Sequence, residues 1–230
     1  MLQKIKMKIL NLYSGVGGNR LLWGSGDITA VERNKRIAGV YRLNFSGDTI
    51  IIADAQDYLL ENNGRFEFTW SSPPCQSHTV MVKTTRHRVR RMPDMSLYQQ
   101  IIFFQHFGKG LWVVENVMPF YKPLIAPTAV LGRHLFWANF EIPHINFRSG
   151  LKGFMGKNSS KDADDLKRKI GIQYPGNVYY ENGHSPTQVL RNCVDPKLGL
   201  YVLRCAEQAA GKENTQRTGV NWINPQLSFL

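Results

Sequence analysis

The feature of this sequence that most constrains its fold is the alternation of short apolar runs with helix-like stretches over residues 7–117. The predicted strands are Lys8–Tyr13, Ile28–Glu32, Thr49–Ala53, Phe66–Trp70 and Leu111–Glu115. The helix-like stretches between them are Arg20–Trp23, Asn34–Asn44, Gln56–Glu61 and Ser96–Phe107. Because parallel strands need crossover helices, this alternation predicts an α/β fold with a mostly parallel sheet and helices on both faces. Right-handed crossovers bring the carboxyl ends of the strands to one edge, where such sheets bind ligands.

The chain changes in character after residue 141. Residues 145–187 are rich in Gly, Lys, Asn and Ser and show weak periodicity, whereas helical spacing returns over Gln188–Ala210. Weak periodicity with turn residues is typical of an insertion or a loop-rich subdomain. We therefore expect a large domain over residues 1–141, a small insertion over residues 142–187, and a C-terminal segment over residues 188–230 that returns to the large domain.

Composition narrows the class of protein. With 43% hydrophobic and 20% charged residues the chain can bury a sizeable core, and no apolar run reaches the roughly 18 residues that a membrane helix needs. The three cysteines, Cys75, Cys193 and Cys205, form neither a disulfide framework nor a metal-ligand spacing, so we expect no metal site and a reducing cytoplasm. The formal net charge of +12 predicts attraction to a polyanion through counterion release from a phosphate backbone.

A glycine-rich turn and two acids follow the first three predicted strands. The first strand ends in Tyr13-Ser14-Gly15-Val16-Gly17-Gly18, and glycines at such a point let the backbone turn tightly and approach a ligand. Glu32 ends the second strand, where a carboxylate can bind both hydroxyls of a ribose, and Asp54 follows the third, where it can accept from an adenine amino group. The turn lacks the Lys-Ser/Thr pair of a P-loop, which argues against a nucleoside triphosphate. The pattern therefore predicts a nucleoside-bearing cofactor.

Candidate catalytic residues follow the fourth and fifth predicted strands. The fourth strand runs into Ser71-Ser72-Pro73-Pro74-Cys75-Gln76-Ser77, where two prolines fix the backbone before a cysteine. A thiolate is a strong nucleophile, although an isolated cysteine is more often a small buried hydrophobic residue. The fifth strand delivers Glu115-Asn116-Val117. A glutamate at such a position is either a structural acid or a general acid beside a substrate.

The order of these motifs resembles that of the DNA cytosine-5 methyltransferase family. Pro-Pro-Cys-Gln at 73–76 followed by Glu-Asn-Val at 115–117 resembles the family's catalytic pair of motifs. The run at 13–18 is similar to its Phe-x-Gly-x-Gly-Gly cofactor motif, with Tyr in place of Phe, and Glu32 and Asp54 match the next two. Arg191-Asn192-Cys193-Val194-Asp195-Pro196 is similar to its last motif, Gly-Asn-x-Val-x-Pro. The resemblance spans residues 8–141 and 188–206 and is closest to small, phage-like members of the family.

This resemblance implies the Rossmann-like fold of S-adenosyl-L-methionine-dependent methyltransferases, with residues 1–141 as the catalytic and cofactor-binding domain and residues 142–187 as a reduced target-recognition insertion. The implied cofactor is S-adenosyl-L-methionine, and the residues implied to hold it are Tyr13, Ser14, Gly15, Gly17, Gly18, Glu32, Asp54, Pro73, Asn192 and Val194.

The implied reaction transfers a methyl group to carbon-5 of cytosine in double-stranded DNA. Cys75 would add to carbon-6, which makes carbon-5 reactive, while Glu115 contacts ring N3 and the amino group. Asn116 would hold the loop that carries the cysteine. Because the cysteine and the methyl donor must both reach one ring, the base must leave the helical stack.

Residues 76–95 resemble the mobile loop that closes over a flipped base. Gln76 and Ser77 are expected to fill the gap in the helix or to contact the sugar. A run of charge is usually a solvated face, but directly after the nucleophile it favours phosphate contacts. The basic residues expected to contact DNA are Lys83, Arg86, Arg88, Arg90 and Arg91.

Two parts of the sequence depart from the family pattern. The Gln-x-Arg-x-Arg segment is reduced to Arg133 and His134. Either residue could hold the cytosine carbonyl, and of the two we favour Arg133. His134 alternates with the strand expected next along the chain and is equally a candidate core residue. The insertion is short, which implies a short or loosely read target. Its candidate DNA contacts are Phe147, Arg148, Lys152, Phe154, Met155, Lys157 and Lys161.

Two other functions stay open on the sequence. One is methylation of cytosine in RNA, and the other is a cofactor-dependent DNA-binding protein that has lost most of its turnover. The intact Cys75 and Glu115 argue against the second. We expect a cytoplasmic protein of a bacterium or of a phage-infected host that acts as a monomer, with double-stranded DNA as its partner and no contact with a membrane.

Overall fold

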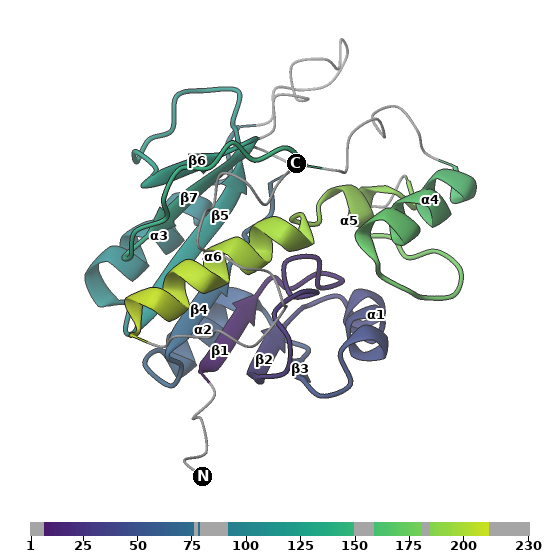
Figure 1. The fold of residues 1–230 in the computed structure, drawn as a ribbon, viewed down its shortest axis with the longest axis horizontal. Helices are drawn as coiled ribbons and strands as arrows, with labels where there is room; N and C mark the ends of the chain where they lie inside the picture. Colours follow the sequence, from purple (N-terminus) through teal and green to yellow (C-terminus); the bar gives the residue numbers. More distant parts are fainter. Residues whose placement is uncertain (1–6, 76–77, 79–91, 150–158, 181–184, 212–230) are drawn as a thin grey trace.

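A seven-stranded sheet lies at the centre of the molecule (Figure 1). The computed structural model describes residues 7–75, 78, 92–149, 159–180 and 185–211. The strands are β1 (Lys8–Leu12), β2 (Asp27–Val31), β3 (Thr49–Ile51), β4 (Phe68–Ser71), β5 (Leu111–Val117), β6 (Ala129–Leu131) and β7 (His134–Ala138). They lie in the order β3-β2-β1-β4-β5-β7-β6, in which β1 to β5 are parallel and β7 is antiparallel to both of its neighbours. The prediction of a mostly parallel sheet is confirmed.

Helices cover both faces of this sheet. They are α1 (Lys35–Asn44), α2 (Ala55–Asn62), α3 (Ser96–Phe107), α4 (Ser160–Ile170), α5 (Gln188–Arg191) and α6 (Pro196–Ala209). In Figure 1, α6 crosses the near face of the sheet, while α2 and α3 lie behind it. The sheet is therefore the middle of three layers.

The alternation of side chains along each strand divides the core between the two faces. In β1, Ile9 packs in the cluster that contains the apolar residues of α6, whereas Leu10 packs in the cluster that contains those of α2 and α3. In β5 the same division separates Val113 from Val114. Near-continuous apolar runs such as these are typical of parallel strands that are buried on both faces.

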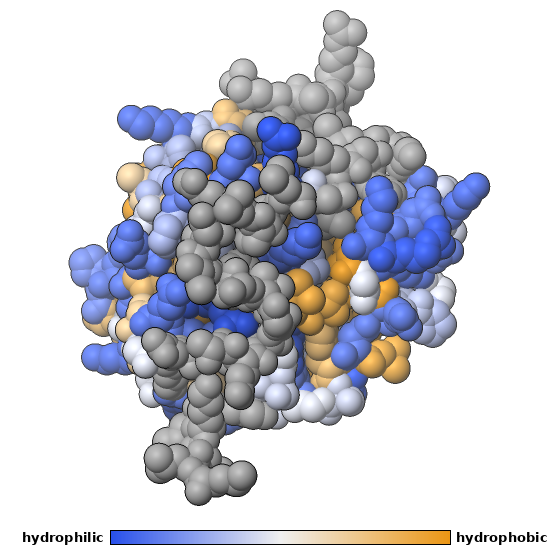
Figure 2. Space-filling model, in the orientation of Figure 1, coloured by the Kyte–Doolittle hydropathy of each residue, from blue (hydrophilic) through white to orange (hydrophobic). Residues whose placement is uncertain are grey.

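A third apolar cluster joins α1 to α4 and α5. Ile37 and Val40 of α1 pack with Ala163, Leu166 and other residues of α4 and the segments around it. Figure 2 shows an apolar area in the region of α1, next to hydrophilic side chains that cover α4. Residues of the expected insertion thus pack against the large domain, although the limits of that insertion stay a prediction.

One predicted helix is wrong. Arg20–Trp23 forms consecutive turns, in which the backbone N–H of Arg20 donates to Gly17 O at 3.1 Å and that of Trp23 donates to Arg20 O at 3.0 Å. The side chain of Arg20 makes two hydrogen bonds of 2.8 Å with the carboxylate of Asp48. These contacts hold the segment as a folded loop after β1 and replace the helix that the apolar spacing indicated.

The connection between strands locates the place where a ligand can bind. The chain passes from β1 to β2 and β3 on one side, and then crosses to β4 and β5 on the other side of β1. Crossovers that diverge in this way leave a crevice at the carboxyl ends of β1 and β4. Every candidate catalytic or cofactor residue on β1, β2, β4 and β5 lies at or just beyond this edge.

Candidate active site

The glycine-rich turn begins with strained backbone directly after β1. Tyr13 has a φ of 54°, the one positive φ of a non-glycine residue among the described residues, and Gly15 and Gly17 have φ values of 55° and 89°. A methyl group added at Gly17 would lie 2.2 Å from the ring of Phe45. At Gly18 it would lie 2.6 Å from Cβ of Cys193. These glycines therefore allow both the bend and the close packing of the turn against later parts of the chain.

Glu32 joins this turn to the end of β2. Its Oε2 accepts the backbone N–H of Gly15 at 3.1 Å, and its Oε1 accepts that of Asn34 at 2.8 Å. Burial raises the pKa of Glu32, while the two backbone donors and the charge of Arg33 oppose the rise. The hydroxyl of Ser14 is buried, and among the described residues it has no hydrogen-bond partner. A carboxylate and a hydroxyl group are thus available next to the turn.

Asp54 and Tyr13 lie on the side of the sheet that α2 and α3 cover. Asp54 caps α2, since its Oδ1 accepts the backbone N–H groups of Gln56 and Asp57, and its side chain is exposed at this edge. Burial raises the pKa of Tyr13 to about 12, although a hydrogen bond from Gln100 opposes this rise. The position of Asp54 is compatible with the predicted contact to an adenine amino group, which stays a prediction.

Gln100 is a fully buried residue of α3 that hydrogen-bonds to residues at the end of β1, at the end of β4 and at the start of α2. Its Nε2 donates to the hydroxyl of Tyr13 at 3.2 Å and to Oε1 of Gln56 at 2.9 Å, and its Oε1 accepts the hydroxyl hydrogen of Ser71. A buried amide with all these groups satisfied fixes the relative positions of β1, β4 and α2. Sequence reasoning missed Gln100, because nothing in a helical pattern shows which polar residue faces the sheet.

Cys75 lies just beyond β4, on a loop that is tied to its surroundings at two points. Asn116 Nδ2 donates to the carbonyl oxygen of Pro73 at 3.0 Å, and the backbone N–H of His78 donates to that of Cys75 at 3.0 Å. His78 is itself fixed by a 2.6 Å hydrogen bond between Nδ1 and the hydroxyl of Tyr121. Burial raises the pKa of the Cys75 thiol to about 11, the charge of Glu115 adds to this rise, and Arg133 opposes it.

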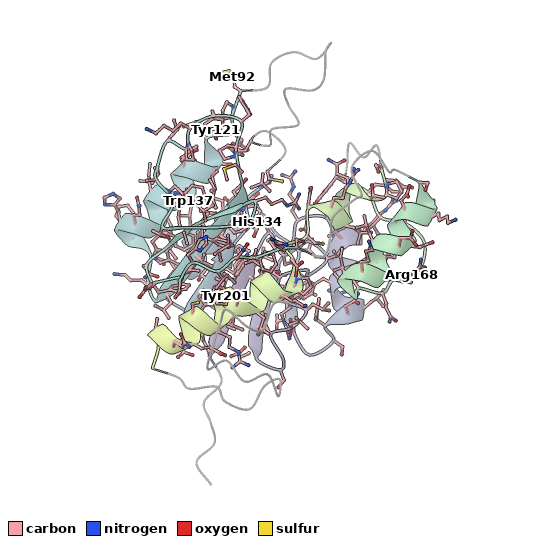
Figure 3. The ribbon with its side chains drawn as sticks, turned by 45° about the horizontal axis from the view of Figure 1, so that its top comes forward. Met92, Tyr121, His134, Trp137, Arg168 and Tyr201 are labelled. Carbon is pink, nitrogen blue, oxygen red and sulfur yellow. The ribbon has the colours of Figure 1, made fainter. Side chains whose placement is uncertain are left out.

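Glu115 stands beside Cys75 with both carboxylate oxygens hydrogen-bonded. Its Oε2 accepts the hydroxyl hydrogen of Ser72 at 2.8 Å, and Ser72 Oγ accepts the indole N–H of Trp70 at 2.7 Å. Its Oε1 lies 2.6 Å from Nδ1 of His134. Glu115 and His134 are 4% and 3% exposed, so this polar chain lies inside the protein. Figure 3 shows His134 near the middle of the molecule, whereas Arg168 of α4 lies at its periphery.

Arg133 and His134 are neighbours in sequence but differ in surroundings. Arg133 is exposed and its Nη2 donates to the carbonyl oxygen of Arg191 at 3.3 Å. It still acts on Cys75 electrostatically. The predicted contact of Arg133 with a cytosine carbonyl stays a prediction, while His134 is the residue that contacts Glu115.

The last motif returns to the glycine turn. A methyl group at Gly18 would lie 2.8 Å from the carbonyl oxygen of Val194, and Asn192 Nδ2 donates to the hydroxyl of Tyr180 at 3.3 Å. Burial raises the pKa of Tyr180, and the charges of Cys193, Glu32 and Cys75 act in the same direction. Tyr180 therefore lies close to both the cofactor and the catalytic candidates. Sequence reasoning missed it, since it falls in the stretch of weak periodicity.

Several predicted DNA contacts lie outside the described residues, namely Gln76, Ser77, Lys83, Arg86, Arg88, Arg90, Arg91, Lys152, Phe154, Met155 and Lys157. Among the others, Arg148 and Lys161 are exposed. Phe147 is a correction, because it is 7% exposed and packs in the same core cluster as the apolar residues of α6. An aromatic residue held in this way is unavailable to DNA.

Two absences hold for the part of the chain that the structure describes. No helix in it is both long and apolar enough to cross a membrane. No group of three or more His, Cys, Asp or Glu side chains in it is arranged to hold a metal ion.

Comparison with known proteins identifies the fold. No protein family and no curated protein matches the sequence. Among solved structures, the methyltransferase EhMeth of Entamoeba histolytica matches 90% of this chain and 99% of its own, with a TM-score of 0.52 at 12% identity. DNMT2 of Spodoptera frugiperda, in a variant form, matches 48% of this chain and 35% of its own, with a TM-score of 0.34 at 29% identity. A SAM-dependent methyltransferase of Agrobacterium tumefaciens matches 50% of this chain and 40% of its own, with a TM-score of 0.37 at 14% identity.

The match to EhMeth extends over nearly the whole chain, whereas the other two cover about half of it. Together with the strand order, it shows that the chain has the Rossmann-like methyltransferase fold, as the sequence predicts.

Proposed function

We propose that this protein is an S-adenosyl-L-methionine-dependent DNA cytosine-5 methyltransferase with Cys75 as its nucleophile. The observation that supports this most strongly is that Cys75, just beyond β4, and Glu115, on the neighbouring strand β5, lie at the same sheet edge as the glycine turn. The charge of Glu115 acts directly on the Cys75 thiol, and Asn116 binds the loop that carries it. A nucleophile and an acid fixed at the sheet edge that carries the glycine turn suit addition to an electron-poor ring.

The residues around the turn fit the cofactor. Gly15 has open space where a side chain would lie, and the Ser14 hydroxyl is buried and, within the described residues, free to bind a ligand. Each oxygen of the Glu32 carboxylate accepts a backbone N–H and can accept a further donor such as a ribose hydroxyl. We assign cofactor binding to Tyr13, Ser14, Gly15, Gly17, Gly18, Glu32, Asp54, Pro73, Asn192 and Val194. When bound, S-adenosyl-L-methionine supplies a methyl group on a positively charged sulfur.

The protein groups explain how cytosine becomes reactive. Bond formation between Cys75 Sγ and carbon-6 moves the ring π electrons toward N3, and a proton from Glu115 to N3 leaves an enamine that is nucleophilic at carbon-5. After methylation, N3 returns its proton to Glu115, the carbon-5 proton passes to water, and departure of the thiolate restores the aromatic ring. Glu115 thus stabilises charge that develops only during the reaction.

The thiol pKa indicates when Cys75 becomes active. With a pKa of about 11, the thiol of the free protein is protonated at neutral pH. A protonated thiol is a weak nucleophile and is protected from adventitious oxidation. A nearby cation lowers this pKa, and Arg133 already acts in that direction.

Double-stranded DNA is the partner that we assign. The net charge of +12 favours a polyanion. The buried position of Glu115 means that a base must enter the sheet edge to reach it, and a base in a duplex does so only after flipping. The basic residues 83–91 directly follow the nucleophile along the chain, which supports phosphate contact near the flipped base.

The test is incubation of unmethylated DNA, and separately of RNA, with the protein and isotope-labelled S-adenosyl-L-methionine, followed by mass spectrometry of the nucleosides. We expect 5-methyldeoxycytidine from the wild type and none from Cys75→Ala, with cofactor binding by calorimetry intact. Cys205→Ala is the matched control, since Cys205 lies in the core on α6 and its loss should leave the product unchanged. Equal product from Cys75→Ala would refute the mechanism, and 5-methylcytidine from RNA alone would move the substrate to RNA.

A further inference from the structure

We propose that His134 is a positioning residue that shares one proton with Glu115 and thereby sets the pH range in which Glu115 can protonate the cytosine ring. This inference rests on the proposed function. It differs from the sequence expectation, which left Arg133 and His134 as alternatives for contact with the substrate, favoured Arg133, and kept His134 as an equal candidate for a core residue.

The pairing follows from the register of β5 and β7. These strands are antiparallel, with Glu115 opposite Phe136 and Val117 opposite His134. Val113 and Phe136 share the α6 side of the sheet, so Glu115 and His134, two residues along each strand, project to that same side. Diagonal neighbours on one face are within reach of long side chains. The observed Nδ1–Oε1 distance of 2.6 Å is at the short end for a hydrogen bond to a charged group.

The other contacts of Glu115 show where the shared proton lies. The indole N–H of Trp70 can only donate, so Ser72 Oγ accepts from it and directs its own hydrogen to Glu115 Oε2. Oε2 is therefore an acceptor. A proton exchanged between Glu115 and His134 then lies on the line from Oε1 to Nδ1. Because the pair is buried, a net charge on it carries a desolvation cost.

The proton transfers balance over the reaction. When Cys75 adds to carbon-6, the shared proton passes from His134 Nδ1 to Glu115 and from Glu115 to N3. The imidazolium becomes a neutral imidazole and Glu115 ends as a carboxylate. When the thiolate departs, N3 returns the proton to Glu115, and His134 regains its own. Once the pair has lost its proton at high pH, Glu115 is a carboxylate and has none to give.

Histidine is suited to this role because it is the side chain that changes charge near neutral pH. Two further ionisable groups share the surroundings of the pair. Cys75 follows β4 and Arg133 immediately precedes His134, and the charges of Glu115 and Arg133 act on the Cys75 thiol in opposite directions. Loss of the shared proton therefore also leaves an uncompensated carboxylate next to the nucleophile.

The first experiment compares pH profiles of kcat/KM, which report groups of the free enzyme. In the wild type we expect the slope of log(kcat/KM) against pH to fall by one where His134 titrates. In His134→Asn the amide can still donate to Glu115 from about the position of Nδ1 but cannot titrate, so this bend should be absent. Ser72→Ala removes the other donor to Glu115 and no titrating group, so its profile should keep the bend at reduced activity.

The second experiment does not depend on turnover. Nitrogen NMR of the histidine side chains follows the titration of His134 in the free protein, with His134→Asn to assign its signal. In Glu115→Gln the titration should move to lower pH, because the negative charge that stabilises the imidazolium is gone. A titration of His134 that is the same in Glu115→Gln would overturn the pair, as would profiles of equal shape for wild type and His134→Asn. A wild type without methylation would instead refute the proposed function.

Discussion

Replacing Gly199 with alanine tests how closely α6 must approach the loop that follows β1. Gly199 is buried in α6, and a methyl group there would lie 2.2 Å from the carbonyl oxygen and 2.7 Å from Cα of Asn19. Both are backbone atoms, so no side chain can turn away. Asn19 is held in turn by a 2.9 Å hydrogen bond from its Nδ2 to Asn11 of β1. Relief of the clash therefore requires movement of the helix or of the loop that ends the glycine turn.

The expected magnitude follows from two opposing effects. Overpacking of a well-filled core costs about 1–3 kcal/mol, and a clash with backbone lies at the upper end of that range. Alanine in place of glycine within a helix stabilises the folded state by about 1 kcal/mol. We therefore expect Gly199→Ala to be less stable than the wild type by about 2 kcal/mol, which for a domain of this size lowers the Tm by about 4–8 °C.

Gly39 provides the matched control. It lies within α1, and a methyl group there would meet nothing within 4 Å. Gly39→Ala should therefore gain the helix contribution alone and raise the Tm by about 2–4 °C. Thermal unfolding by circular dichroism measures both variants, and calorimetry should show weaker cofactor binding in Gly199→Ala only. A Tm for Gly199→Ala at or above that of the wild type would refute the packing described between α6 and the loop.

Three further predictions use other parts of the structure. The rate of alkylation of the folded Cys75 thiol by iodoacetamide should rise about tenfold per pH unit up to pH 11, whereas in the unfolded chain it should level off near the ordinary pKa of about 8.5. Glu115→Gln should shift the folded profile to lower pH, and a folded profile that levels off near 8.5 would contradict the burial of the thiol. Arg20→Ala should lower the free energy of unfolding, measured in urea, by about 3–5 kcal/mol, because it leaves the buried Asp48 carboxylate without its ion pair. A loss below about 1 kcal/mol would show that the pair does not stabilise the fold. Glu32→Ala should weaken cofactor binding at least tenfold by calorimetry, equivalent to about 1.4 kcal/mol, and unchanged affinity would remove Glu32 from the cofactor site.

The sheet could be predicted from the sequence because its parallel strands are buried on both faces. Such strands leave uninterrupted apolar runs, and the predicted runs overlap β1 to β5 with ends that differ by a few residues at most. The turn at residues 20–23 was mispredicted for the opposite reason. Its apolar spacing fits a helix, but the ion pair of Arg20 with Asp48 comes from a distant part of the chain and holds a different conformation.

The sequence around α4 contains signals for both ends of a helix, which periodicity does not reveal. Ser159 accepts the backbone N–H of Asp162, and Asp162 accepts that of Ser159, which together form a capping box. Gly171 ends the helix with a φ of 90°. Ser-x-x-Asp followed by a glycine twelve residues after the cap appears in the printed sequence, and these termini predict a helix where periodicity alone is weak.

The candidate site divides in the same way. Residues that belong to one short motif, such as the glycine turn and the Pro-Pro-Cys loop, could be proposed from the sequence, and the structure brings them to one sheet edge. The contact between Glu115 and His134 depends on the register of an antiparallel pair of strands. The contacts of Gln100 depend on which side of α3 faces the sheet. Neither property is encoded in a local run of residues, so both required the structure.

The most direct test of the central claim is to identify the bond between Cys75 and the target base. Release of the enzyme requires loss of the proton on carbon-5, and fluorine at that position cannot leave in its place, so DNA that contains 5-fluorocytosine should trap the adduct. With S-adenosyl-L-methionine present, we expect mass spectrometry of the digested complex to find a nucleotide linked to the peptide that contains Cys75, and no complex from Cys75→Ala. A link through another residue, or normal methylation of ordinary DNA without any trapped complex, would contradict the assignment of Cys75 as the nucleophile.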